Sequence, residues 1–208
     1  MTLRTALRPL ALTAVFCAAL PGFAAFAQDT AATEPAATEP AATEPAERQI
    51  GEPYVAATHN DWEVLCSVID ANGTTNCEMY QLLRDPTDQP VAEISIAALP
   101  LGAEFAAGAT ITTPLETFLP TGLGWAIDDA EEMRVEQFRV CTVVGCIVRM
   151  GISAEEVDTL RAGTNAKIII APFVAIDQPV EITVSLSGFT AAYADLQTRL
   201  SEAAAASR

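Results

Sequence analysis

Several segments of this chain alternate apolar and polar residues with the period of two that is typical of half-buried β-strands. The clearest is 180–186, where Val, Ile, Val and Leu alternate with Glu, Thr and Ser. Another is 62–68, which the turn pair Asn72-Gly73 follows, so 74–83 is predicted to return as its partner strand. Further strands are predicted over 91–98, over 135–141 paired tightly with 146–150, and over the continuously apolar run 168–170, which we expect to be buried on both faces.

Two short helices are predicted in the last third of the chain. Ser153 and Glu156 have the spacing of a capping box, and Gly163 is placed to end that helix. A second helix is expected from about Gly188, with an apolar stripe at helical spacing that we interpret as core packing. Many short strands with few helices predict a mainly β fold, an antiparallel β-sandwich or a partly open barrel with one or two short helices.

The N-terminal segment has the order of a secretory signal peptide. Arg4 and Arg8 precede a short apolar run, and Ala25-Phe26-Ala27 supplies small residues for a signal peptidase. We therefore expect residues 1–27 to be removed by cleavage before Gln28.

Beyond the signal peptide the composition changes twice. Residues 28–57 are predicted to be a disordered linker, because 31–45 is built on three copies of Ala-Ala-Thr-Glu-Pro and lacks residues that could form a core. A single β domain is predicted over 58–200, followed by a disordered tail over 201–208.

The mature chain keeps four of its five cysteines, because Cys17 leaves with the signal peptide. Four cysteines allow three disulfide connectivities. Pairing Cys66 with Cys77 and Cys141 with Cys146 fits the strand pattern best, since each pair flanks a predicted hairpin. These spacings are too long for a zinc site, and an exported protein meets an oxidising compartment. A redox-active role for Cys141–Cys146 stays open as an alternative.

Charge and composition exclude some functions. The net charge is -16, and loss of two arginines with the signal peptide makes the mature chain more acidic, so nucleic acid is not an expected partner. The chain has one histidine, His59, which we interpret as a solvated turn residue beside the linker.

The remaining candidate for chemistry is an acidic cluster. It comprises Asp128, Asp129, Glu131 and Glu132. The cluster lacks the spacing of an EF-hand and is interpreted as a solvated loop, although weak calcium binding is the alternative. The chain has no nucleophile-elbow, zinc-protease or phosphate-loop motif. We therefore predict no catalytic, cofactor-binding or metal-binding residues, and no cofactor.

Taken together, several short motifs resemble the invasion-associated locus B family of exported alphaproteobacterial proteins. The motifs are Trp62 with Cys66 and Cys77, the segment 122–128, Phe138-x-x-Cys141-x-x-x-Gly145-Cys146, and Val184-Ser185-Leu186-Ser187-Gly188-Phe189. The resemblance spans most of 60–200 and implies a β-rich exported domain. It carries over no catalytic residues.

These observations predict a binding protein of the cell envelope and not an enzyme. We expect it in the periplasm or at the outer membrane, with peripheral membrane association as one form of attachment. Its partner is expected to be an envelope protein, cell-wall material or an external ligand, with edge strands as natural docking elements through strand addition. The alternative is a periplasmic enzyme, redox or hydrolytic, with a site that the sequence does not reveal.

Overall fold

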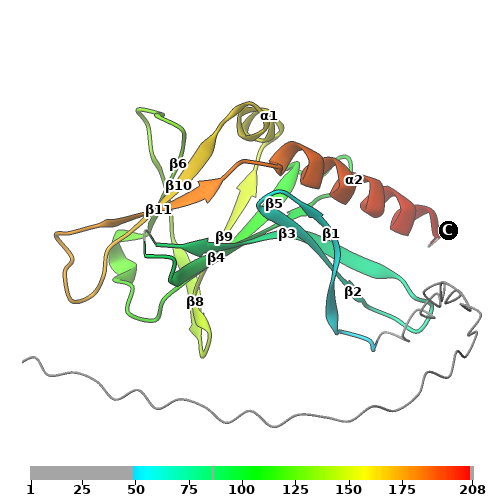
Figure 1. Cartoon of the computed structure of the whole chain (residues 1–208), viewed down its shortest axis with the longest axis horizontal. Coiled ribbons are helices and arrows are strands. Elements are labelled where there is room, and N and C mark those ends of the chain that lie inside the picture. The colour runs from blue at the N-terminus through cyan, green and yellow to red at the C-terminus, as the bar shows by residue number, and fades with distance from the viewer. Residues whose placement is uncertain (1–48, 86, 207–208) are drawn as a thin grey trace, which may run out of the picture. The chain divides into compact units, whose positions relative to one another are not determined.

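The computed structural model describes residues 49–85 and 87–206. These residues form two open antiparallel β-sheets and two α-helices, so the predicted mainly β, antiparallel fold with one or two helices and two disulfides is confirmed (Figure 1). The predicted signal peptide and residues 28–48 of the predicted linker lie outside the described residues.

The larger sheet has seven strands in the order β1-β2-β3-β4-β5-β9-β8. Its strands are β1 (Pro53–His59), β2 (Trp62–Val68), β3 (Thr75–Arg84), β4 (Pro90–Ala98), β5 (Ala107–Thr113), β9 (Gly145–Ile152) and β8 (Phe138–Thr142). The first five are joined in succession as hairpins, and β8 and β9 add a further hairpin at the far edge. Gly73 has φ +82° in the turn between β2 and β3, which fits the predicted Asn72-Gly73 turn.

The smaller sheet has four strands in the order β11-β10-β6-β7. Its strands are β6 (Leu123–Ile127), β7 (Arg134–Glu136), β10 (Asn165–Ile170) and β11 (Val180–Ser185). A short 3-10 helix, η1 (Leu119–Thr121), precedes β6.

The single strand predicted over 135–141 is wrong. The chain leaves β7 of the smaller sheet, passes Gln137 and enters β8 of the larger sheet, so one apolar stretch supplies strands to two sheets. The predicted double burial of 168–170 is also only partly met, because Ile168 and Ile170 are buried while Ile169 is half-buried.

The helices are α1 (Ala154–Ala162) and α2 (Phe189–Ala206). Ser153 caps α1 by accepting a hydrogen bond from the Glu156 amide at 3.1 Å, as the capping box predicts. Gly163 follows this helix with φ -77°, so a left-handed backbone conformation does not explain the glycine. Close packing explains it better, because an added Cβ would lie 2.9 Å from both Asp128 Oδ2 and Leu186 Cδ1.

Two predicted boundaries and one predicted helix length differ from the structure. Strand β1 begins at Pro53, inside the predicted linker 28–57, because it pairs with β2 and covers part of the core. Helix α2 runs for 18 residues and continues to Ala206, so it is not short and residues 201–206 are not a disordered tail. Alanine favours helix without needing a partner surface, which explains this continuation.

The core lies between the larger sheet and the elements packed on it. Trp62 is fully buried and meets the Phe189 ring edge-on at 5.7 Å, and Phe189 stacks on Tyr193 at 5.9 Å. Helix α2 lies along β1 to β4 and contributes this apolar stripe (Figure 1). The stripe is therefore core packing, as predicted.

Polar groups join the two sheets at the end of β11. Gln81 is 7% exposed, and its side chain accepts from the Ser185 amide at 2.9 Å and donates to the Ser185 carbonyl at 3.1 Å. The Trp62 indole donates to the same carbonyl at 2.9 Å. Buried polar side chains that find all their partners in this way favour one fixed arrangement of the strands.

Candidate functional site

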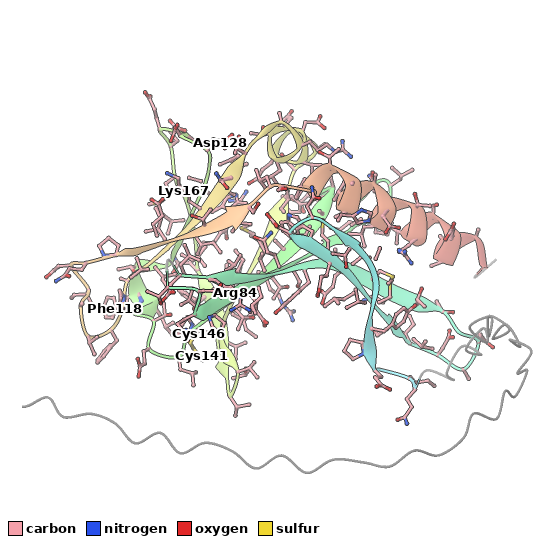
Figure 2. All side chains as sticks on the ribbon, in the orientation of Figure 1. Arg84, Phe118, Asp128, Cys141, Cys146 and Lys167 are labelled. Carbon is pink, nitrogen blue, oxygen red and sulfur yellow. A yellow bond between two sulfur atoms is a disulfide. The ribbon has the colours of Figure 1, made fainter. Side chains whose placement is uncertain are left out.

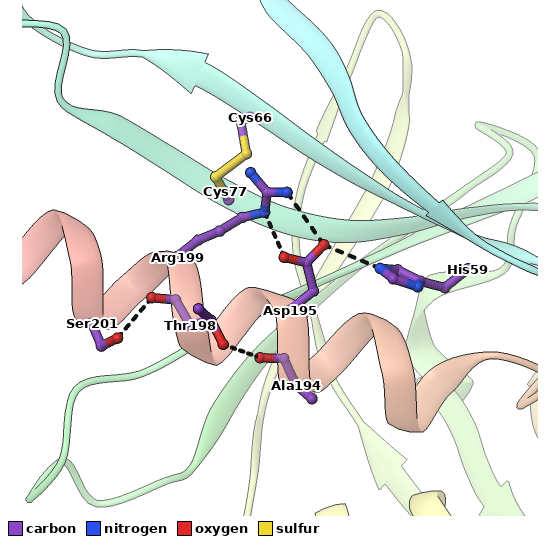
Figure 3. Close-up of polar contacts among 8 residues, drawn as sticks. All are labelled: His59, Cys66, Cys77, Ala194, Asp195, Thr198, Arg199 and Ser201. Atoms are coloured by element: carbon purple, nitrogen blue, oxygen red, sulfur yellow. Dashed lines mark hydrogen bonds and ion pairs between the residues drawn. A yellow bond between two sulfur atoms is a disulfide. The ribbon is translucent and has the colours of Figure 1, made fainter.

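His59 is not the solvated turn residue that the sequence suggested. It ends β1, is half-buried, and its Nε2 lies 3.1 Å from Oδ2 of Asp195 on α2 (Figure 3). Arg199, one turn further along α2, donates to both oxygens of the same carboxylate, at 2.9 Å and 3.3 Å. These three side chains tie the end of β1 to the helix.

The charges in this group explain the state of Asp195. Burial raises the pKa of its carboxyl, but hydrogen bonds from His59 and Arg199 and the arginine charge outweigh burial, so the pKa lies below its usual value. Among the residues that the structure describes, no hydroxyl or thiol hydrogen-bonds to the His59 ring. The arrangement therefore orients the ring but shows no attached nucleophile for it to activate.

The predicted acidic cluster contains one residue with a structural role. Asp128 has φ 48°, and its Oδ1 accepts from the amides of Thr164 at 3.0 Å and Asn165 at 2.9 Å. These amides lower the pKa of the Asp128 carboxyl. The other three acids, Asp129, Glu131 and Glu132, are exposed, and Figure 2 places Asp128 well away from the Cys141–Cys146 hairpin.

The described ranges contain no group of three or more His, Cys, Asp or Glu side chains arranged to hold a metal ion. Neither of the described helices is long and apolar enough to cross a membrane.

Both disulfides join residues that face each other directly across a hairpin, which confirms the predicted pairing. Cys66 pairs with Cys77 across β2 and β3, and Cys141 with Cys146 across β8 and β9. Each disulfide has one buried cysteine, Cys66 or Cys146, both 1% exposed. Their other cysteines differ in access, since Cys77 is half-buried whereas Cys141 lies exposed on the edge strand β8. A reductant therefore meets the second disulfide more readily.

A half-buried ionic group links the smaller sheet to α1 and was not predicted. The Glu156 carboxylate accepts from the Trp125 indole at 3.0 Å and from Arg134 at 2.8 Å. Arg134 also donates to the Gly151 carbonyl at 3.2 Å and lies 3.1 Å from Glu136. The Glu156 carboxylate thus binds side chains of β6 and β7. These bonds replace the bond to the Ser153 amide that a complete capping box would have.

Exposed apolar side chains gather where two loops and the β8–β9 hairpin meet. The two loops, 114–121 and 171–179, are joined by hydrogen bonds from the Phe118 amide to Ala171 and from the Phe173 amide to Glu116, both 2.7 Å long. Val144, at the hairpin tip, shares a groove of about 390 Å³ with Pro114 and the ends of β3 to β5. Figure 2 shows Phe118 and the Cys141–Cys146 pair toward this end.

We call these side chains the apolar rim. Its members and exposed fractions are Leu115 57%, Phe173 68%, Val174 84%, Ile176 47%, Val143 95% and Val144 75%. Single exposed apolar residues need no explanation, but six of them on two joined loops and a neighbouring hairpin tip make this end of the molecule a candidate interaction surface. Sequence reasoning missed the rim, although the apolar run 171–176 between Asp177-Gln178-Pro179 and a strand was a readable signal.

Comparison with known protein families identifies the family of this chain. The family model described as "Invasion associated locus B (IalB) protein" matches residues 62–197. This chain belongs to that family. The sequence-based resemblance is therefore confirmed.

Named relatives are similar over most of the chain. Invasion protein B homolog of Brucella abortus is 28% identical over 147 residues, which is 71% of this chain and 82% of the relative. Invasion protein B of Bartonella bacilliformis is 28% identical over 171 residues, 80% of this chain and 84% of the relative.

A solved structure shares the fold. The crystal structure of invasion associated protein B from Bartonella henselae matches with a TM-score of 0.58 at 22% identity, over 68% of this chain and 95% of that chain. At that identity the likeness concerns the fold alone.

Proposed function

We propose that this IalB-family protein is an exported binding protein of the cell envelope, which acts through the apolar rim and not by catalysis. The rim is the observation that carries the proposal, because its side chains reach 95% exposure, backbone hydrogen bonds join its two loops, and Val144 of the hairpin shares a groove with Pro114 of one loop. Burying such side chains against a partner is favourable by about 25 cal/mol per Å² of apolar area.

Export is the second part of the proposal and rests on the signal-peptide pattern of residues 1–27. Mass spectrometry of the protein from its own cells should find Gln28 at the N-terminus. A full-length species as the main form would contradict export.

Site-specific photo-crosslinking tests the binding surface. A photoreactive phenylalanine analogue replaces Phe173 in the mature chain, and a control variant carries it at Ile69, which is 55% exposed in the β2–β3 turn. With envelope extract of the source bacterium, we expect a discrete adduct from position 173 that saturates and is competed by unlabelled protein. Equal adducts from both positions, or none at saturating protein, would count against binding through the rim.

A further variant separates binding from catalysis. His59→Gln removes the group best placed for proton transfer, although it also alters the contact with Asp195. If a folded His59→Gln protein still forms the adduct and restores a deletion strain, the binding proposal holds. If it forms the adduct but fails to restore the strain, the protein is an enzyme and the proposal is wrong.

A further inference from the structure

Two arginines stand out in a chain that is otherwise strongly acidic. The chain has 27 Asp and Glu residues but only 11 Lys and Arg. Within residues 49–85 and 87–206, most basic side chains lie within ion-pair distance of a carboxylate. These are Arg84, Arg134, Arg161, Lys167 and Arg199. Arg139 and Arg149 are the arginines of these ranges that make no ion pair.

Both unpaired arginines belong to the β8–β9 hairpin. Arg139 lies on β8 and Arg149 on β9, and both are exposed. Arg149 alternates with buried Val148 and Met150, so it projects from the face of the sheet opposite the core. There it borders a shallow depression of about 410 Å³, which Gly108, Gly151 and Ala97 also line.

The hairpin also carries exposed apolar side chains. Val140 is 53% exposed, and the tip residues Val143 and Val144 belong to the apolar rim. The hairpin therefore combines two arginines that make no ion pair with apolar side chains that are exposed to solvent. A matching partner supplies carboxylates beside apolar side chains.

We propose that the β8–β9 hairpin docks an acidic segment of a partner protein, with Arg139 and Arg149 contacting carboxylates and Val140, Val143 and Val144 contacting apolar side chains. This inference rests on the proposed binding function and names the chemistry of the partner. A lipid surface fits less well, because Glu116 and Asp177 are exposed on the two rim loops and would be repelled by anionic headgroups.

The contact is made by side chains and not by strand addition. Strand β8 ends the larger sheet, but its pairing with β9 shifts register between Phe138 and Val140, which leaves Arg139 as an extra residue in the edge. Bulges and charged side chains on an edge discourage pairing with another strand. At this edge, contact through side chains takes the place of the strand addition expected from the sequence.

A peptide selection tests the proposal. Random peptides displayed on phage are selected on the mature chain, and the affinity of selected peptides is measured by fluorescence anisotropy. The double variant Arg139→Glu/Arg149→Glu is compared with Lys167→Glu, a charge reversal on the smaller sheet far from the hairpin in Figure 2. Both variants should remain folded, and the double variant should keep the Tm because neither guanidinium has an ion-pair partner.

We expect selected peptides to be enriched in Asp and Glu next to apolar residues and to bind the double variant about tenfold more weakly. Their affinity should fall with salt, and Lys167→Glu should bind like the unmodified chain. Selection without acidic enrichment, or equal binding by the double variant, overturns the inference. So does binding to phosphatidylglycerol vesicles that the double variant loses, since the hairpin then recognises lipid.

The peptide-binding experiment and the crosslinking experiment can fail independently of each other. If the adduct from position 173 persists in the double variant and peptides show no preference, binding through the rim stands and the acidic partner is wrong. If position 173 gives no adduct while acidic peptides still bind the hairpin, the hairpin chemistry stands and the rim proposal fails.

Discussion

Replacing Gly188 with alanine should destabilise the protein through a steric conflict that can be isolated experimentally. Gly188 has φ +89° and lies against β1, so that an added Cβ would overlap the carbonyl oxygen of His59. The residue stands between β11 and α2, where the chain must turn before Phe189 enters the core. Two contributions therefore lower the free energy of unfolding, one from the positive φ of the new alanine and one from the overlap of its Cβ with His59.

The structure provides a control that carries only the first contribution. Gly102 has φ +91° in the loop between β4 and β5, and an added Cβ there would meet nothing within 4 Å. An alanine in this conformation costs about 1–2 kcal/mol. Overpacking adds about 1–3 kcal/mol at Gly188, because the neighbour is backbone and cannot rotate away.

Thermal unfolding of the oxidised mature protein, followed by near-UV circular dichroism and calorimetry, measures the difference. For a domain of this size 1 kcal/mol shifts Tm by about 2–4 °C, so Gly188→Ala should lie about 2–12 °C below Gly102→Ala. Equal Tm values for the two variants would refute the reasoning, since they would mean that β1 moves away from Gly188 without cost. A Gly188→Ala protein as stable as the unmodified chain would refute the assigned backbone conformation as well.

Three further predictions concern the ion pair, the disulfides and the repeat. Because the folded pKa of Asp195 is depressed, its stabilisation is complete above the unfolded pKa of about 3.9 and is lost as pH falls through the folded value. Urea unfolding should therefore show Asp195→Asn less stable than the unmodified chain at pH 6, with the gap closing below about pH 4; a gap independent of pH contradicts this. Under limiting reductant, peptide mapping should find Cys141–Cys146 opened before Cys66–Cys77, because Cys141 is exposed whereas Cys77, the more accessible cysteine of the other disulfide, is half-buried; the reverse order would contradict the assignment of access. The segment 31–45 contains only Ala, Thr, Glu and Pro and so carries no large apolar side chain; its deletion should barely change Tm, and a fall of many degrees would mean that the repeat packs on the domain.

The strands that could be predicted are those whose apolar positions carry large side chains. In β2 the buried positions are Trp62, Val64 and Cys66, and in β11 they include Ile182 and Val184, so alternation is visible. Strand β5 alternates equally well in the structure, but its buried positions include Ala107, Ala109 and Thr113, which carry little hydrophobic signal. Its place in the sheet is determined by its neighbours β4 and β9 and not by its own composition.

Separation along the chain explains why the disulfide pairing could be predicted and the ionic contacts could not. Cys141 and Cys146 face each other across one hairpin, so their spacing along the chain reports their spacing in space. His59 and Asp195 are 136 positions apart and meet only after α2 has packed along β1 to β4. Trp125 and Glu156 likewise meet through the packing of α1.

The residues behind the family resemblance are largely occupied in holding the fold together, which affects where binding specificity can reside. Trp62 and Ser185 join the two sheets, and Gly145 begins β9 so close to β5 that an added Cβ would overlap the Thr113 carbonyl. Gly188 turns the chain against His59. By contrast, the apolar rim, Arg139 and Arg149 are exposed and contribute no ion pair among the described residues, so changing them leaves these contacts intact. The two groups of residues should therefore separate in experiment, with substitutions in the first lowering Tm and substitutions in the second altering partner affinity at constant Tm.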